Sequence, residues 1–190
     1  MSEAGTQENK KSIGRKAAKS YTDDICHADT ASMHINMQAI GVVHSSYRER
    51  FATPRQPVLD KAMPAEIRLN AGLNLHQALQ DLDSFSHIWV IYWMHLNKGW
   101  NPTVTPPRGP KIRRGLFATR APHRPNSIGL SAVRLKAIKG RTLHIESHDM
   151  LDGTPVLDIK PYLPYADAIT DASSGWLEDV GLHAKLGRSG

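Results

Sequence analysis

The chain has 190 residues, of which 40% are hydrophobic, and a formal net charge of +6 at neutral pH, which suits one domain with a packed core. Its one cysteine, Cys26, excludes a disulfide scaffold and a cysteine-rich zinc site. No apolar run reaches membrane-spanning length and no apolar signal-peptide segment is present, so we expect a cytosolic protein.

The basic residues are concentrated in about a third of the chain. Residues 1–83 hold ten Lys/Arg and ten Asp/Glu, and residues 142–190 hold three Lys/Arg and eight Asp/Glu. Between Ser84 and Ile145 there are eleven Lys/Arg and no acid. Such a segment is typical of proteins that bind a polyanion. The alternative is a solvated basic face that keeps the protein soluble.

Strands dominate the predicted secondary structure. Residues 1–36 are polar and without periodicity, which predicts a disordered extension. The expected strands are, in chain order, Gln38–Ser46, Ala65–Asn70, Ser86–His95, Arg114–Arg120, Ile128–Ile138, Thr142–Ser147 and Val156–Tyr162. An amphipathic helix is expected over Leu73–Phe85, where apolar residues recur at helical spacing. After Asp167 the pattern supports at most one weak helix.

This pattern predicts a mainly β fold, in which mostly antiparallel strands close into a small barrel with one or two short helices. There is no regular βαβ alternation, no G-x-G-x-x-G after a strand and no G-x-x-x-x-G-K-[ST]. Neither a Rossmann dinucleotide site nor a P-loop is therefore expected. We assign residues 37–168 to the barrel domain and residues 169–190 to a C-terminal tail.

Three loops combine prolines with arginines. They are Phe51–Pro57 (FATPRQP), Asn101–Gly115 (NPTVTPPRGPKIRRG) and Gly115–Ser131 (GLFATRAPHRPNSIGLS). Prolines restrict loop motion and lower the ordering cost of binding, so these loops resemble pre-organised binding loops. The alternative is that they are plain structural connections.

A further polar segment, Ser147–Tyr165, gathers acids around an Asp-Gly turn. A metal site here would use His144, His148, Asp149 and Asp152. Their spacing matches no zinc or calcium pattern, and Asp-Gly is ordinary turn chemistry, so no metal is predicted.

Two histidines belong to the expected central strand. We expect His87 to be a hydrogen-bonded core residue, whereas His95, where the strand ends, is a better site candidate. No serine lies in a nucleophile-elbow context, so nothing favours a hydrolytic triad.

Together these motifs resemble the TrmO/TsaA-like family of S-adenosylmethionine-dependent tRNA methyltransferases. The matching segments are IGVVHSSYRERFATPRQP, LDSFSHIWVIYWMH, GWNPTVTPPR, GLFATRAPHRPNSIGLS and DMLDGTPVLDIKPYLPYAD, in the family's order from Ile40 to about Asp167. The resemblance implies a β-barrel methyltransferase and a homodimer with the cofactor near the subunit interface. The implied reaction is methylation of the exocyclic amine of threonylcarbamoyl-adenosine, next to the anticodon of threonine-type tRNA.

Motif positions also imply residue roles. The expected contacts of S-adenosylmethionine are Arg55, Gln56, Pro57, Met94, His95, Arg120, Leu130, Ser147, His148, Asp149, Asp152 and Gly153. His95 and Asp149 are the candidate proton acceptors, because the attacking nitrogen becomes acidic only as the new bond forms. The expected tRNA contacts are Arg108, Arg114, Arg124, Lys160 and Tyr162, since arginine suits phosphate and carboxylate and aromatic rings stack on unpaired bases.

Two positions depart from the family pattern. Ser127 stands where proline is usual and Val58 where glycine is usual, which leaves the geometry of those loops open. We also expect this chain to lack the C-terminal domain of longer bacterial members. Two alternatives stay open: a non-catalytic RNA-binding barrel, and a methyltransferase for another RNA or small molecule. A third, hydrolysis of a nucleotide-like ligand, rests on the acidic turn alone.

Overall fold

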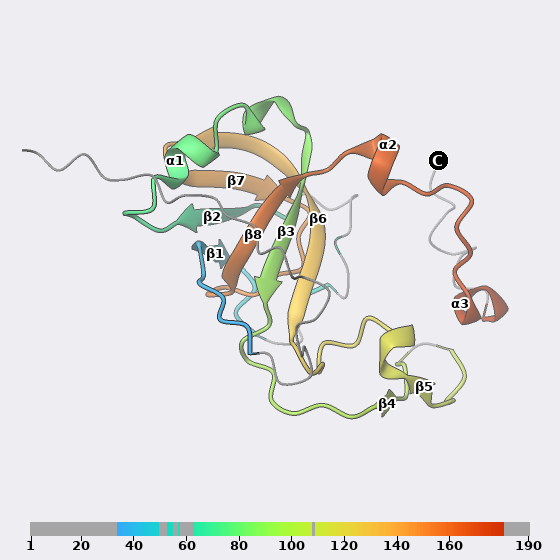
Figure 1. Ribbon diagram of the computed structural model, residues 1–190. Coiled ribbons are helices and arrows are strands. Elements are labelled where there is room, and N and C mark those ends of the chain that lie inside the picture. The colour runs from blue at the N-terminus through green and yellow to red at the C-terminus, as the bar shows by residue number, and fades with distance from the viewer. Residues whose placement is uncertain (1–33, 50–52, 55–56, 58–62, 108, 181–190) are drawn as a thin grey trace, which may run out of the picture. The chain divides into compact units, whose positions relative to one another are not determined.

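The computed structural model describes residues 34–49, 53–54, 57, 63–107 and 109–180. The chain divides between Asn36 and Met37 into two units. In the second unit, six strands form a closed barrel in the order β1-β2-β7-β6-β3-β8, and every neighbouring pair is antiparallel (Figure 1). The expected fold class is confirmed.

The elements follow the predicted order. The barrel strands are β1 (Gly41–Ser45), β2 (Ala65–Leu69), β3 (His87–Trp93), β6 (Ile128–Lys139), β7 (Thr142–Glu146) and β8 (Pro155–Pro161). A separate two-stranded sheet joins β4 (Thr103–Val104) to β5 (Arg114–Gly115). The helices are α1 (Leu75–Ala78), α2 (Pro164–Asp167) and α3 (Trp176–Asp179), with 3-10 turns at Leu82–Ser84 and Leu116–Ala118. No described helix is long and apolar enough to cross a membrane.

The longest strand pair is β3 with β6, which lie side by side in Figure 1. Their register runs from His87 opposite Arg134 to Trp93 opposite Ile128. Successive side chains of a strand point to opposite faces, so every second residue faces the interior. In β6 the buried residues are Gly129, Ser131, Val133 and Leu135, and in β3 they are Ile88, Val90 and Tyr92. The predicted hairpin is confirmed as β6 and β7.

Two predicted elements are wrong in part. The helix expected over Leu73–Phe85 is only α1 and a 3-10 turn, because Asp81 adopts a left-handed conformation with φ of 64° that interrupts the helix. The strand expected over Arg114–Arg120 is limited to the two residues of β5. It then turns at Leu116–Ala118, where the Thr119 hydroxyl donates a 2.8 Å hydrogen bond to the Leu116 carbonyl.

The strand directions gather most of the candidate residues at one end of the barrel. Because neighbouring strands are antiparallel, the ends of β1, β3 and β7 lie beside the starts of β2, β6 and β8. The connections 46–64, 94–127 and 147–154 therefore open at this end. Among the predicted site residues, Lys160 and Tyr162 lie at the opposite end, where β8 finishes.

Candidate active site

Asp149 lies where the connection between β7 and β8 meets the barrel interior. Its Oδ1 accepts a 2.6 Å hydrogen bond from the Ser131 hydroxyl, and the Tyr92 hydroxyl oxygen lies 3.3 Å from the same Ser131 oxygen. Ser131 has one hydroxyl proton and donates it to Asp149, so the Tyr92 hydroxyl donates in the second bond. Ser131 and Tyr92 are 2% and 7% exposed. The three side chains thus form a chain of hydrogen bonds that runs from Tyr92 through Ser131 and ends at the carboxylate of Asp149.

Burial is the largest influence on this carboxylate and raises the pKa of Asp149. Hydrogen bonds from Ser131, from its own main chain and from Tyr92, together with the charge of Arg120, oppose the rise in pKa. Burial also raises the pKa of Tyr92 to about 12, and the charge of Asp149 adds to it. Tyr92 therefore remains a donor at neutral pH, and Asp149 is the group in this cluster that can accept a proton.

Gly129 allows the Tyr92 ring to reach this position. The two residues are opposite each other in the register of β3 and β6. A Cβ atom at residue 129 would overlap the Tyr92 ring. The ring thus occupies the space that any side chain at residue 129 would need.

His148 brings a buried donor to the same connection. Ser147 turns the chain out of β7 with φ of 60°, a left-handed conformation that is uncommon outside glycine. The His148 side chain is 1% exposed, and its Nδ1 accepts a 3.2 Å hydrogen bond from the Met150 main chain, which leaves the proton on Nε2. Burial lowers the pKa of His148. Among the described residues Nε2 has no hydrogen-bond partner, so it is a donor that a bound ligand could satisfy.

The arginine-bearing loop before β6 uses its two arginines differently. Arg120 is exposed, and its charge lowers the pKa of Asp149. Arg124 instead donates to the carbonyls of Thr119 and Ala121 at 3.0 and 3.3 Å. Arg120 therefore acts on the charge state of Asp149, whereas Arg124 stabilises the conformation of the loop.

An apolar surface borders this end on the outside of β3 and β6. Leu130, Trp93 and Ile128 are 57%, 50% and 39% exposed, and the register places them on one outer face. We call these three residues the outer patch. Directly after Trp93, the Met94 side chain packs against the core, and the His95 ring centroid lies 6.1 Å from that of Trp93.

The structure does not describe several of the residues that the sequence analysis singled out. Arg55, Gln56, Val58 and Arg108 lie outside the described residues, and Pro57 is half-buried. The structure does describe Ser127, the other departure from the family pattern. Its carbonyl accepts a 2.8 Å hydrogen bond from the Met94 main chain, and its hydroxyl donates to the Arg124 carbonyl at 3.5 Å.

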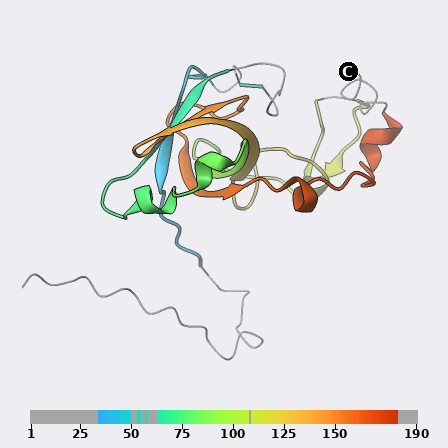
Figure 2. The ribbon, with the colours of Figure 1, turned by 90° about the horizontal axis from the view of Figure 1, so that it is seen from above.

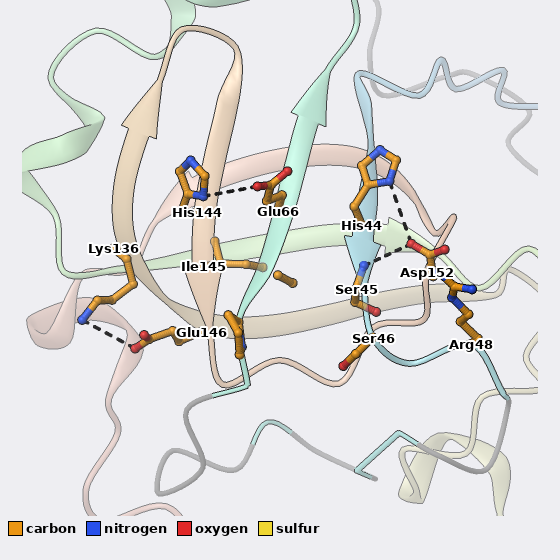
Figure 3. Close-up of a pocket in the computed structure, with 12 residues that line it drawn as sticks. His44, Ser45, Ser46, Arg48, Glu66, Lys136, His144, Ile145, Glu146 and Asp152 are labelled. Carbon is orange, nitrogen blue, oxygen red and sulfur yellow. Dashed lines mark hydrogen bonds and ion pairs between the residues drawn. The ribbon is translucent and has the colours of Figure 1, made fainter.

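Asp152 points away from Asp149, although both belong to the same connection. Its Oδ1 accepts a 3.1 Å hydrogen bond from the Ser45 main chain and lies 3.9 Å from Nδ1 of His44. Gly153 next to it has φ of 77°, which suits glycine in the turn. Asp152 borders a pocket on the outer surface of β1, β2 and β7 (Figure 3), and the volume of this pocket is about 500 Å³.

The carboxylates of this pocket are already paired. Glu66 accepts hydrogen bonds of 3.0 and 2.8 Å from Arg68, which hold the pKa of Glu66 low, and lies 3.6 Å from His144 (Figure 3). Glu146 lies 3.6 Å from Lys136. Among the described residues, no group of three or more His, Cys, Asp or Glu is arranged to hold a metal ion. The Asp149 cluster is therefore the better candidate for proton transfer.

The residues expected to contact tRNA are spread over the domain. The Arg114 guanidinium lies 5.0 Å from the Trp176 ring centroid in α3, which lies beside β5 in Figure 2. Lys160 forms a 2.8 Å ion pair with Asp158, and that hydrogen bond raises the pKa of Lys160. Tyr162 packs against Trp89, with ring centroids 5.4 Å apart.

The expectation that His87 is a core residue is wrong. The side chain is half-buried at an outward position of β3, although it is hydrogen-bonded as expected, with Nδ1 2.9 Å from the Ser86 hydroxyl.

Sequence reasoning did not identify Tyr92, Ser131 or Gly129. The signal was present in part, because Tyr92 and Ser131 occupy inward positions of alternating strands, where a buried hydroxyl needs a partner. The partner itself depends on the register between β3 and β6, which the sequence does not reveal.

The chain is similar to known proteins over about three quarters of its length. Residues 42–168 match the family model described as tRNA-methyltransferase O N-terminal domain. The tRNA (adenine(37)-N6)-methyltransferase of Escherichia coli (strain K12) is 46% identical over 150 residues, covering 75% of this chain and 64% of that protein. A Pyrococcus abyssi protein named "Probable S-adenosyl-L-methionine-binding protein" is 41% identical over 139 residues, covering 73% of this chain and 74% of that protein. The crystal structure of TrmO from Pseudomonas aeruginosa superposes with a TM-score of 0.63 at 41% identity, covering 75% of this chain and 62% of that chain.

The matched region includes nearly the whole barrel and the Asp149 cluster. The matched part of the chain spans 64% of the length of the Escherichia coli relative. The fold, the order of the motifs and the family match agree, and the chain belongs to the tRNA-methyltransferase O N-terminal domain family.

Proposed function

We propose that this chain is an S-adenosylmethionine-dependent methyltransferase that methylates the N6 amine of adenine 37 in tRNA, the reaction named for its Escherichia coli relative. The observation that carries the proposal is the hydrogen-bonded Asp149 at the open end of a barrel of this family. We further propose a substrate adenosine that bears a threonylcarbamoyl group in threonine-type tRNA, and a cytoplasmic location.

The chemistry of the described residues fits S-adenosylmethionine, which combines an adenosine, an amino-acid group and a sulfonium cation. Arg120 would pair with the carboxylate, and Asp149 offers the opposite charge to a cation. Leu130 in the outer patch offers apolar contact, and His148 Nε2 offers a buried donor. Arg55, Gln56, Pro57, Met94, His95, Ser147, Asp152 and Gly153 remain proposed contacts by motif position.

When bound, this cofactor supplies an electrophilic methyl group whose bond to sulfur breaks as the bond to the amine nitrogen forms. The protein mainly aligns the reacting groups, and alignment of this kind can contribute about 7–11 kcal/mol. The amine nitrogen becomes acidic during transfer, and Asp149 accepts its proton. Ser131 fixes the acceptor by holding its Oδ1, and Tyr92 in turn fixes Ser131. His95 is the second candidate acceptor.

The proposal includes a homodimer with the cofactor near the subunit interface. The outer patch is the surface best suited to this contact, because burying exposed apolar side chains is favourable. Sedimentation velocity is expected to give one species of twice the 21.0 kDa chain mass. A monomer at micromolar concentration would remove the dimer from the proposal.

The direct test is incubation with S-adenosylmethionine and threonine tRNA that carries threonylcarbamoyl-adenosine, followed by mass spectrometry of the nucleosides. One added methyl on that nucleoside is expected with wild-type protein. Unmodified tRNA controls for the need for the prior modification. No product despite cofactor binding would point to another methyl acceptor.

The alternative of a non-catalytic RNA-binding barrel is separated by a thermal shift with S-adenosylhomocysteine. At about 100 times the dissociation constant, binding at one site is expected to stabilise the folded protein by about 2.7 kcal/mol. A barrel that only binds RNA should show no shift.

A further inference from the structure

Phe117 is held on the surface by a rigid turn. Its side chain is 78% exposed, whereas the preceding residue of the same 3-10 turn, Leu116, is 2% exposed. The Leu116 main chain donates a 2.9 Å hydrogen bond to Pro102, and its carbonyl accepts from the main chain and hydroxyl of Thr119 at 3.1 and 2.8 Å. The turn is thus fixed on both sides while the ring is open to solvent. Core packing does not require a phenylalanine here.

Arg124 covers part of the Phe117 ring. Its guanidinium carbon lies over the ring, 5.4 Å from the centroid. The guanidinium cannot move freely, because it donates to the carbonyls of Thr119 and Ala121. The ring is therefore held from one side by a fixed cation, and most of its surface remains accessible.

The sequence on both sides of Phe117 is strongly basic. The segment from Ser84 to Ile145 contains eleven Lys/Arg and no acid, and Lys111, Arg113, Arg114 and Arg120 belong to it. A partner for this surface needs negative charge and a flat face for the exposed ring. Unpaired bases of a single-stranded nucleic acid combine both properties. A second copy of this chain would bring the same basic segment and be repelled.

We propose that Phe117, supported by Arg124, stacks against an unpaired base of the tRNA anticodon loop. The inference rests on the proposed function for the identity of the RNA, and it adds a residue that the motifs did not assign. Phe117 lies three residues before Arg120, in the same connection between β5 and β6.

The test is a fluorescence anisotropy titration with a labelled anticodon stem-loop of threonine tRNA. Phe117→Ala is expected to weaken binding by about 5- to 150-fold, the effect of losing one base–aromatic stack. Phe117→Tyr and Phe117→Trp are expected to retain the affinity, whereas Phe117→Leu keeps an apolar side chain without a π-face and is expected to behave like alanine. Ile112→Ala is the matched control, because Ile112 is a 50% exposed apolar residue of the same basic segment.

A fully paired RNA duplex of the same length separates stacking from electrostatic attraction. Wild type and Phe117→Ala are expected to bind it equally, because it offers no unpaired base. Equal affinities of wild type and Phe117→Ala for the stem-loop, or full affinity of Phe117→Leu, would overturn the proposal. A shift of Phe117→Ala from dimer to monomer in sedimentation would also overturn it, since the ring would then contact a second copy.

The test of the stacking contact can fail or succeed independently of the test of the proposed methyl transfer. In the methylation assay, Phe117→Ala is expected to raise the KM for tRNA more than it lowers kcat, with unchanged affinity for S-adenosylhomocysteine. Loss of stem-loop binding in Phe117→Ala, with no methyl transfer by wild type, would support the stacking contact and reject the reaction. Because Phe117 is exposed, thermal melting of the variant should match wild type and confirm folding.

Discussion

Ser131 donates a 2.6 Å hydrogen bond to Asp149, which joins an interior position of β6 to the connection that follows β7. The carboxylate is subject to two opposed effects: burial raises its pKa, and the hydrogen bond from Ser131 is the largest influence that lowers it. Ser131 is therefore the residue whose hydrogen bond does most to lower the pKa of Asp149.

Ser131→Ala is expected to move the acid limb of kcat/KM to higher pH. A base acts only when deprotonated, so activity falls as the pH drops through its pKa, and loss of the hydrogen bond raises that pKa further. The pH profile of methyl transfer measures the limb. Ser45→Ala is the matched control, because the Ser45 hydroxyl donates to the Met150 carbonyl and not to a carboxylate. An unmoved limb in Ser131→Ala would exclude Asp149 as the acceptor that the profile reports.

Asp149→Asn is expected to lower kcat by about 10²- to 10⁴-fold, the usual contribution of a general base. The amide oxygen can still accept from Ser131, and the variant carries no buried charge, so its stability at neutral pH should not fall. Single-turnover methyl transfer and thermal melting measure the two effects. Asp158→Asn, at an ion-paired carboxylate, is the control. A wild-type rate in Asp149→Asn would transfer the proton-accepting role to His95.

Gly129→Ala is expected to destabilise the protein by about 1–3 kcal/mol, because the new methyl group overlaps the Tyr92 ring. Thermal melting should show a lower Tm. Gly115→Ala is the matched control, since a Cβ there meets no atom within 4 Å and its φ of −55° suits alanine. Equal Tm values for the two variants would show that the Tyr92 ring moves aside without loss.

Arg120→Ala is expected to weaken S-adenosylhomocysteine binding by about 10- to 100-fold, the effect of losing a hydrogen bond to a charged group. Isothermal titration calorimetry measures this affinity, and Arg55→Ala is expected to act in the same direction. Arg113→Ala serves as control, because its guanidinium donates to the Thr103 hydroxyl at 2.6 Å. If the affinity is unchanged in Arg120→Ala, Arg120 has no role in holding the cofactor.

His148 is expected to make the fold sensitive to acid. Burial lowers its pKa in the folded protein below the ordinary value of 6.5, so the unfolded chain binds more protons between the two values. The stability is complete above the ordinary pKa and is lost as the pH falls toward the lowered one. Urea unfolding at a series of pH values should show this slope in wild type and a weaker one in His148→Gln. The exposed His76→Gln should retain the wild-type slope.

The barrel was predictable because its signal is local. Alternation and a Lys-Gly-Arg turn indicate the β6–β7 hairpin, and a long apolar run indicates β3. The prediction of one helix over Leu73–Phe85 is wrong in part, because apolar spacing alone does not show that Asp81 leaves the helical region of φ and ψ. Local pattern thus predicts strands well and short helices poorly in this chain.

The site was predictable only in its general location. Family resemblance indicated Asp149, but its partners Ser131 and Tyr92 depend on the register between strands that are distant in sequence. The turn that holds Asp149 also holds Asp152, and the structure directs the two carboxylates to different surfaces. Sequence proximity therefore grouped side chains that the fold separates.

The barrel cannot close during synthesis until its last strand, β8, has been made. β8 pairs with β3 on one side and with β1 on the other, where Gly41 is opposite Val156. A nascent chain that ends before Pro155 can form only an open sheet, whose two edges, β1 and β3, both carry unpaired main-chain groups. Both edges stay unpaired until β8 emerges during translation, because the strand that covers one exposed edge is also the strand that covers the other.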